Sequence, residues 1–544
     1  MSARRFAAAL ALAFTASGCA GGGRAVPAAR QPAAGSRVPV SFVMHWPARA
    51  QSAQRRPAFV SPSAASVVVE VNPDAASAGA VTFANAPSGG GTSTVAIDAP
   101  PGADVFVISL YDVPQTPGET AAAGNELGRV RLTQTIVPNT TNALSATVIG
   151  TVAAIRIGPL PNQSNVLSVA GSSPAAYELV GRAPATFAVA PLDAGGNVIL
   201  QPDAPPAIAL APNVRATGIL TVTPVSGTTD QFSVQAVAPN TTTYPTSLAA
   251  TATDANGNVA TSTTIVDATS ATYVAYANGG ATAIARFDPH GTPLALAAGA
   301  FAGLGNPVAL AYDPDDREIL VADAGLGKVL AFDESGAPLA AFAAPPVAGV
   351  NGVAYDPHNG NVYASGSSGV TVFAPSGGAP KGGVPASFAV PNAQGIAFVV
   401  TSSTSTLNRL AVGSTAATPA LRFYSETGSG AGSVTLPAAP IAVAYAAPAG
   451  AGQVPQTTAQ LYVTTASGVL ARDAFGAAVA AAADAGAPFG IAVDPNLGAP
   501  LAAERAANAL TGYLDDLSAL DPARTFVTPA SLGLAQPQGV CFVF

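Results

Sequence analysis

The stretch that decides the fold runs from Pro307 to Gly336 and reads PVALAYDPDDREILVADAGLGKVLAFDESG. Its three apolar runs are separated by Asp, Pro and Gly residues, a pattern that predicts three short strands joined by tight turns. The same pattern starts again at Val350 with VNGVAYDP, NVYASG and VTVFAPSG. The chain therefore contains a repeated unit made of short strands.

The openings of this unit recur at nearly constant spacing to the end of the chain. When the small residue before the first branched apolar residue is taken as the start, consecutive starts are 43, 43, 47, 48 and 49 residues apart. The six starts are Ala309, Gly352, Gly395, Ala442, Gly490 and Gly539. Steps of roughly 40 to 50 residues with several strands each are typical of β-propeller blades. Six openings predict six blades.

The last opening leaves too few residues for a blade of its own. The segments TYVAYANG at 272–279 and AIARFDPHG at 283–291 supply a second and a third strand that lack a first. We therefore expect the final strand, Gly539 to Phe544, to complete the blade begun at Thr272. Closing a loop of about 270 residues costs roughly 5 kcal/mol, which burial of three apolar side chains at about 1.5 to 3 kcal/mol each offsets.

Composition limits the classes of function. The chain has 544 residues, 49% of them apolar and only 10% charged, with 55 Gly and 48 Pro, which suits several domains built from short strands. The net charge is −8, and the only lysines, Lys328 and Lys381, form no basic patch. We therefore expect no nucleic-acid partner.

The N-terminus has the pattern of an export signal. Arg4 and Arg5 precede the apolar run FAAALALAF, which is too short to span a bilayer, so residues 1–18 are predicted to be a signal peptide. The sequence Ala-Ser-Gly-Cys that ends at Cys19 resembles the lipobox of bacterial lipoproteins, with Ala16 where that family usually has Leu. The resemblance implies that Cys19 carries the lipid that anchors the protein to the cell envelope. An ordinary signal peptide with a chance cysteine is the alternative.

Residues 19–58 are predicted to be the lipidated N-terminus and a flexible basic linker, rich in Ala, Pro, Gly and Arg. The arginines of this segment could contact anionic lipid head groups. The alternative is that the segment is only a solvated spacer. Within it, the apolar run VPVSFVMHWP at 38–47 is expected to pair with the following domain. His45 and Trp46 are interpreted as packing residues, and Cys541, which takes the place of a repeat alanine, as a small buried residue.

Two β-sandwiches are predicted between the linker and the propeller, over 59–164 and 165–268. Each contains several short alternating runs separated by turn residues. The expected strands of the first are 65–71, 93–99, 104–112, 126–136 and 146–157.

Two turns, Asp193-Ala-Gly-Gly-Asn197 and Asp254-Ala-Asn-Gly-Asn258, resemble the D-A-x-G-N turn of invasin-type bacterial Ig-like domains. The resemblance implies Ig-like domains in which Asp organises the turn and Gly supplies positive φ. A calcium loop of EF-hand type is not supported, because Val259 and Ile265 occupy the places of its Gly and its closing acid.

The repeats over 269–544 resemble NHL-type propellers, with their PxGVAxDP openings and third strands that end in F-D-x-x-G. That family and its neighbours include calcium-dependent lactonases and a peptide-amidating lyase, and also modules that only bind. The regular acids Asp313, Asp356 and Asp494 fall in Asp-Pro turns, where Asp commonly organises a hairpin. His290 and His358 lie in turns of different blades, and three histidines are too few for a zinc site unless carboxylates assist.

The sequence thus predicts an all-β lipoprotein with two Ig-like sandwiches and a six-bladed propeller closed by the C-terminal strand. Its blade openings predict a narrow, apolar channel, better suited to packing than to catalysis. We expect a binding protein for a protein, peptide or glycan, with no cofactor, no catalytic residues and no metal. The alternative is a propeller hydrolase or lyase of the lactonase type, which three or more Asp, Glu, Asn or His side chains converging in the channel would favour.

Overall fold

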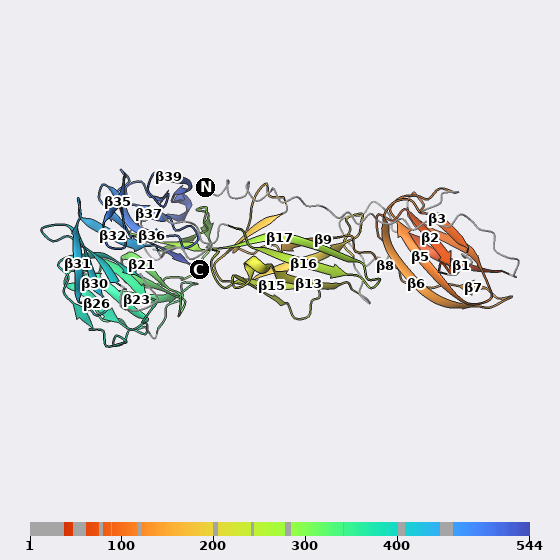
Figure 1. Ribbon diagram of the computed structural model, residues 1–544, viewed down its shortest axis with the longest axis horizontal. Coiled ribbons are helices and arrows are strands. Elements are labelled where there is room, and N and C mark those ends of the chain that lie inside the picture. The colour runs from red at the N-terminus through yellow and green to blue at the C-terminus, as the bar shows by residue number, and fades with distance from the viewer. Residues whose placement is uncertain are drawn as a thin grey trace.

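The computed structural model describes residues 37–46, 61–74, 80–88, 90–117, 122–173, 175–199, 205–240, 244–277, 284–340, 342–400, 409–446 and 461–544. The described chain is all-β, as predicted, with short 3-10 turns such as Val214–Ala216 and Ala530–Leu532. Two sandwiches and a ring of sheets follow one another along the long axis of the molecule (Figure 1). The predicted signal peptide, residues 1–18, and Cys19 lie outside the described residues.

The first sandwich encloses one core between two sheets. The apolar run at 38–47 forms the central strand of the smaller sheet, and its alternating burial points Val40 and Phe42 toward the other sheet. This part of the predicted linker therefore pairs with the following domain, as expected. The smaller sheet consists of β1 (Val38–Trp46), β4 (Gly91–Ala99) and β7 (Asn142–Ala143). The larger sheet consists of β2 (Ser66–Val71), β3 (Val81–Asn85), β5 (Gly102–Tyr111), β6 (Glu126–Ile136) and β8 (Ile149–Gly150).

The second sandwich has four strands in one sheet and five in the other. Phe187 and Val234 from the first of these sheets pack against Leu248 and Val266 from the second. The four-stranded sheet is β9 (Ala154–Pro159), β12 (Ala185–Leu192), β14 (Leu220–Pro224) and β15 (Gln231–Ala236). The five-stranded sheet is β10 (Val166–Ser168), β11 (Ala176–Val180), β13 (Ala207–Pro212), β16 (Ser247–Thr253) and β17 (Val259–Thr269).

One expected strand is divided between the two sandwiches. The run at 146–157 was expected to be a single strand of the first sandwich, but β8 pairs with β6 there whereas β9 pairs with β12 in the second. The backbone N–H of Val152, between these strands, donates to Asp254 Oδ2 at 3.0 Å. The chain therefore passes to the second sandwich between residues 150 and 154, earlier than the predicted boundary after 164.

The two D-A-x-G-N turns lie where the sandwiches meet. In each, one oxygen of the Asp carboxylate accepts the N–H of the Asn four residues later, at 2.9 Å from Asn197 and 3.0 Å from Asn258. Asn197 Nδ2 also donates to Ser63 Oγ of the first sandwich at 2.8 Å. These turns fold as the sequence predicts and in addition hold the two sandwiches together.

Six sheets of three or four antiparallel strands form the rest of the described chain, and we number them ring sheets 1 to 6. Ring sheets 1 to 3 are β18 (Ala271–Tyr276), β19 (Ile284–Phe287), β20 (Pro293–Leu294) and β40 (Pro537–Val543); β21 (Pro307–Asp313), β22 (Glu318–Asp323) and β23 (Lys328–Asp333); and β24 (Gly352–Asp356), β25 (Asn361–Gly366), β26 (Gly369–Phe373) and β27 (Ser387–Phe388). Ring sheets 4 to 6 are β28 (Ala393–Val399), β29 (Arg409–Ser414), β30 (Ala420–Ser425) and β31 (Gly430–Thr435); β32 (Pro440–Tyr445), β33 (Leu461–Thr465), β34 (Gly468–Arg472) and β35 (Ala478–Ala483); and β36 (Pro488–Val493), β37 (Pro500–Glu504), β38 (Ala509–Tyr513) and β39 (Leu520–Val527).

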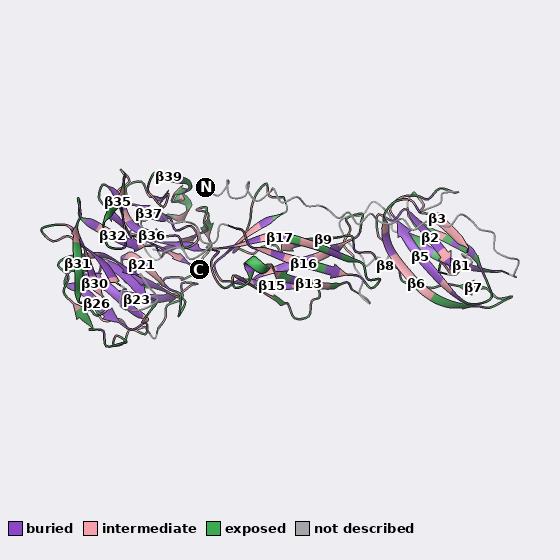
Figure 2. Cartoon of the chain, viewed as in Figure 1, coloured by how far each residue is buried: buried purple, intermediate pink, exposed green. Residues whose placement is uncertain are grey.

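The inner strands of these sheets close a circle. In the order β40, β21, β24, β28, β32 and β36, each inner strand contacts the next, and β36 contacts β40 again. This arrangement is that of a β-propeller, so the predicted propeller is confirmed. The second strands of the ring sheets are buried at nearly every position, as in β25, whereas the outer strands β31 and β35 are mostly exposed, and the sandwich strand β1 alternates between buried and more exposed positions (Figure 2).

The small residues at the blade openings allow the inner strands to approach closely. A Cβ on Gly539 would lie 2.9 Å from the Cα of Ala309, and one on Gly490 would overlap the carbonyl oxygen of Gln538. The recurring small residue is therefore a requirement of the ring, because the inner strands meet backbone to backbone.

The C-terminal strand joins the sheet that starts the ring. β40 pairs with β18 in antiparallel register, with Cys541 opposite Tyr273 and Val540 opposite Val274. This is the pairing that the sequence predicted. Cys541 is 5% exposed, as expected for the place of a repeat alanine, and burial raises the pKa of its thiol.

Candidate functional site

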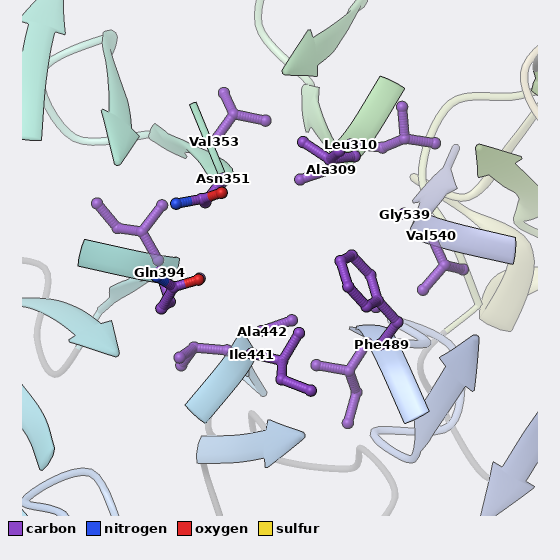
Figure 3. A pocket seen from close by; sticks show the side chains of 17 residues that line it. Ala309, Leu310, Asn351, Val353, Gln394, Ile441, Ala442, Phe489, Gly539 and Val540 are labelled. Carbon is purple, nitrogen blue, oxygen red and sulfur yellow. The ribbon is translucent and has the colours of Figure 1, made fainter. Parts of the chain in front are cut away.

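A cavity of about 210 Å³ lies at the centre of the ring, between the starts of the inner strands. In five of the six openings, the residue that precedes the small residue lies at the mouth, so that each of five ring sheets contributes one side chain. These five are Val308, Asn351, Gln394, Ile441 and Phe489. Figure 3 shows Asn351, Gln394, Ile441 and Phe489 around the opening, with the Phe489 ring pointing into the cavity.

Most of the side chains that line the cavity are apolar, as the sequence predicted. Below the mouth, the wall consists of residues such as Leu310, Val353 and Ile396. Its polar side chains are two neighbouring amides, and Asn351 Nδ2 donates to the carbonyl oxygen of Ala393 at 3.1 Å. An amide held in this way can orient a ligand by hydrogen bonds while the apolar wall excludes water.

An arginine stacks on the aromatic residue at the mouth. The guanidinium of Arg505, which follows β37, lies 3.8 Å from the centroid of the Phe489 ring. Burial lowers the pKa of Arg505, and its Nε has no hydrogen-bond partner among the described residues. Arg505 therefore offers N–H donors and a positive charge beside an apolar cavity.

The other side of the ring contacts the second sandwich. We call the side that carries the cavity mouth the start face and the opposite side, where the inner strands end, the end face. Asn496, on the end face, accepts from Ser270 Oγ at 3.0 Å and donates to the carbonyl oxygen of Ala268 at 2.9 Å. His290 Nε2 lies 3.0 Å from Glu178 Oε2 of the second sandwich. Because these contacts occupy the end face, the start face is directed away from the sandwiches (Figure 1).

The regular acids of the repeats organise turns on the end face, as predicted. One carboxylate oxygen of each accepts the N–H two residues later, with distances of 2.9 Å at Asp313, 2.9 Å at Asp356 and 2.8 Å at Asp494. None of the three lines the cavity.

The structure brings together one cluster that the sequence did not predict. A ligand atom from each of Asp356, His358 and Glu426 lies within 4.8 Å of the others, on the end face between ring sheets 3 and 4. Burial raises the pKa of Asp356 to about 7. The spacing of Asp356 and His358 was visible in the sequence, but Glu426 comes from the β30–β31 turn of the next ring sheet, and nothing in the sequence marked it.

A second buried acid lies near the start face. Glu504, at the end of β37, is 1% exposed, and its pKa is raised to about 9 by burial and by the neighbouring Asp484. Tyr513 donates its hydroxyl proton to Asp484 Oδ2. These surroundings favour the neutral form of Glu504, next to a carboxylate that accepts a hydrogen bond from Tyr513.

No helix among the described residues is both long and apolar enough to span a membrane.

Comparison with known proteins gives distant structural likeness only. No family model matches the chain, and no curated protein matches it. A chain from a nidogen/laminin complex is 14% identical over 51% of this chain and 98% of its own length, with a TM-score of 0.38. A putative 6-phosphogluconolactonase from Bacteroides uniformis is 16% identical over 51% of this chain and 99% of its own length, with a TM-score of 0.33. The β-propeller domain of Swd1 from Myceliophteria thermophila is 15% identical over 40% of this chain and 69% of its own length, with a TM-score of 0.29.

Proposed function

We propose that the protein is a lipoprotein of the bacterial cell envelope that binds a protein, peptide or glycan on the start face of its ring. In this proposal a lipid on Cys19 anchors the chain, and a basic tether connects this anchor to the folded domains. Two Ig-like sandwiches then hold a six-bladed, NHL-type propeller away from the membrane. The observation that carries the proposal is the orientation of the ring. Its end face contacts the second sandwich, and the cavity mouth lies on the opposite face.

The chemistry of the mouth favours a polypeptide among the three ligand classes. An apolar wall with Phe489 at its rim suits an aliphatic or aromatic side chain, and burial of one such side chain contributes about 1.5 to 3 kcal/mol. The Arg505 guanidinium, stacked on Phe489, is placed to pair with a carboxylate of the same segment. The proposed ligand is therefore a peptide segment with an apolar residue next to an acidic one.

The lactonase-type hydrolase or lyase remains the competing hypothesis, and the channel does not meet the criterion set for it. Of Asp, Glu, Asn and His, the described residues that line the cavity contribute Asn351 alone. The cluster of Asp356, His358 and Glu426 lies on the end face, outside this cavity. We therefore propose binding in preference to catalysis.

Photo-crosslinking tests the binding face. Benzoylphenylalanine in place of Phe489 should form an adduct with the ligand in cell envelopes, and mass spectrometry of the adduct distinguishes a polypeptide from a glycan. Phe475 on the end face is a matched control, because it is also a phenylalanine next to an arginine. Its ring centroid lies 4.8 Å from the guanidinium carbon of Arg409, and the residue is 60% exposed. Adducts from position 489 that are absent from position 475 support the proposal, whereas equal adducts from both positions, or none, contradict it.

The anchor has a separate test. The Cys19→Ala variant should move from the membrane fraction to the soluble fraction. Unchanged membrane association would contradict the lipid anchor but would not bear on the proposed binding face, so the two parts of the proposal are tested separately.

A further inference from the structure

Two turns of neighbouring ring sheets meet at the Asp356, His358 and Glu426 cluster. Asp356 is the last residue of β24 and His358 lies in the β24–β25 turn of ring sheet 3, whereas Glu426 lies in the β30–β31 turn of ring sheet 4. His358 Nδ1 lies 3.5 Å from Glu426 Oε1. Two ligands of a tetrahedral ion with bonds of 2.0–2.1 Å lie about 3.4 Å apart, so these two atoms are already at the separation that such an ion requires.

Buried oxygens in this cluster lack hydrogen-bond donors. Asp356 is fully buried, and its Oδ1 accepts the backbone N–H of His358 at 2.9 Å, but its Oδ2 has no hydrogen-bond partner among the described residues. Glu426 Oε1 also has none among them, while its Oε2 lies 3.4 Å from Asn359 Nδ2. A buried carboxylate oxygen without a donor is costly, and an absent ion is one of its ordinary explanations.

We propose that Asp356, His358 and Glu426 bind one divalent cation of the zinc class. One imidazole nitrogen and two carboxylate oxygens are a donor set that Zn²⁺ accepts, whereas Ca²⁺ and Mg²⁺ prefer oxygen alone. Three protein ligands leave the fourth tetrahedral position to water, and the His358 side chain is 37% exposed, so an ion can enter from solvent. Bound there, the cation supplies the positive charge that balances the two carboxylates, and it connects ring sheets 3 and 4.

A second turn of the same sequence provides the control. Asp288 and His290 have the same D-P-H spacing, but Asp288 Oδ1 accepts two backbone N–H groups at 2.8 Å, from His290 and Thr292. His290 uses its Nε2 for Glu178. Among the described residues, the ligand atoms at this turn do not converge as they do at Asp356.

Metal binding to the purified full chain tests the proposal, after EDTA treatment and buffer exchange. Titration calorimetry with ZnCl₂ should show one equivalent bound in the wild type, and the affinity should fall more than about 100-fold in His358→Ala, beyond the 10–100-fold loss typical of outer-shell changes. CoCl₂ should give visible absorption bands that the same variant lacks. His290→Ala should bind as the wild type does.

Glu426→Gln provides a second variant with little change in shape, and it should also lose the tight site. The melting temperature of each metal-free variant shows whether the ring is folded, and excess ZnCl₂ should raise that temperature only where all three ligands are present. Absence of zinc binding by the wild type, or binding by His358→Ala and Glu426→Gln that is as tight as that of the wild type, would overturn the proposal.

Discussion

The hydroxyl of Tyr312 donates to the carbonyl oxygen of Phe544 at 2.8 Å, while the Phe544 side chain packs in the core of the second sandwich. Tyr312 belongs to the ring, so the last residue of the chain joins ring and sandwich. The guanidinium of Arg182 lies 5.5 Å from the centroid of the Phe544 ring and covers it. The same C-terminal segment therefore closes the ring and fixes the ring on its support.

Truncation of this residue should loosen the junction. Phe544→Ala removes a side chain that is 5% exposed, and such a loss costs about 3 to 5 kcal/mol when the cavity cannot collapse. Differential scanning calorimetry should show a lower melting temperature, and proteolysis should become faster between 269 and 271. An unchanged melting temperature and cleavage pattern would show that Phe544 does not join the two parts.

The contact between His290 and Glu178 should depend on pH. The hydrogen bond to Glu178 raises the pKa of His290 above its ordinary value of 6.5. Since the folded state holds this proton more tightly, the stabilisation is complete below pH 6.5 and is lost as pH rises through the folded pKa. The His290 side chain is half-exposed, so the contribution of the pair is less than about 1 kcal/mol. The stability difference between wild type and His290→Ala should be larger at pH 5.5 than at pH 8.5, and a constant difference would exclude the pair as its source.

The buried acid Glu504 should make the ring less stable at high pH. Its pKa is about 9 in the folded protein, so between pH 4.5 and 9 the folded state binds more protons than the unfolded state, and stability falls as pH rises. The slope is at most about 1.4 kcal/mol per pH unit. Glu504→Gln keeps the neutral form at every pH and should flatten the profile of unfolding free energy in urea. Parallel profiles for variant and wild type would contradict the assignment.

The close approach of the inner strands predicts a sharp contrast between two glycines. Gly490→Ala places a Cβ against the Gln538 carbonyl oxygen and should cost about 1 to 3 kcal/mol. Gly430→Ala, in the exposed strand β31, has open space around the new Cβ and should change stability little. Calorimetric melting of both variants gives the comparison. Equal melting temperatures would mean that the backbone contact at Gly490 is not close.

Much of the fold could be predicted because it depends on local patterns. The repeat openings marked the inner strands, the short remainder after Gly539 indicated a closing strand, and Asp193 and Asp254 marked turns. The single strand expected over 146–157 was wrong, because an alternating pattern does not say which of two adjacent sheets a strand joins.

The candidate site could be predicted only in its general character. The openings predicted an apolar channel, but the stacking of Arg505 on Phe489 joins the turn after β37 to the inner strand β36, and nothing in the repeat pattern marked Arg505. Likewise, Glu426 reaches Asp356 from the neighbouring ring sheet. Such contacts depend on how adjacent sheets are placed around the ring, which the spacing of strands along the chain does not specify.

The central claim is that the C-terminal strand closes the ring, and the reactivity of Cys541 tests it most directly. Cys541 lies opposite Tyr273 in the β40–β18 pair, and it is 5% exposed with the pKa of its thiol raised by burial. Native protein is treated with N-ethylmaleimide, and alkylation of the peptide that contains Cys541 is measured by mass spectrometry over time. The account predicts no modification at Cys541 until urea unfolds the ring, and rapid modification in the native protein would contradict it.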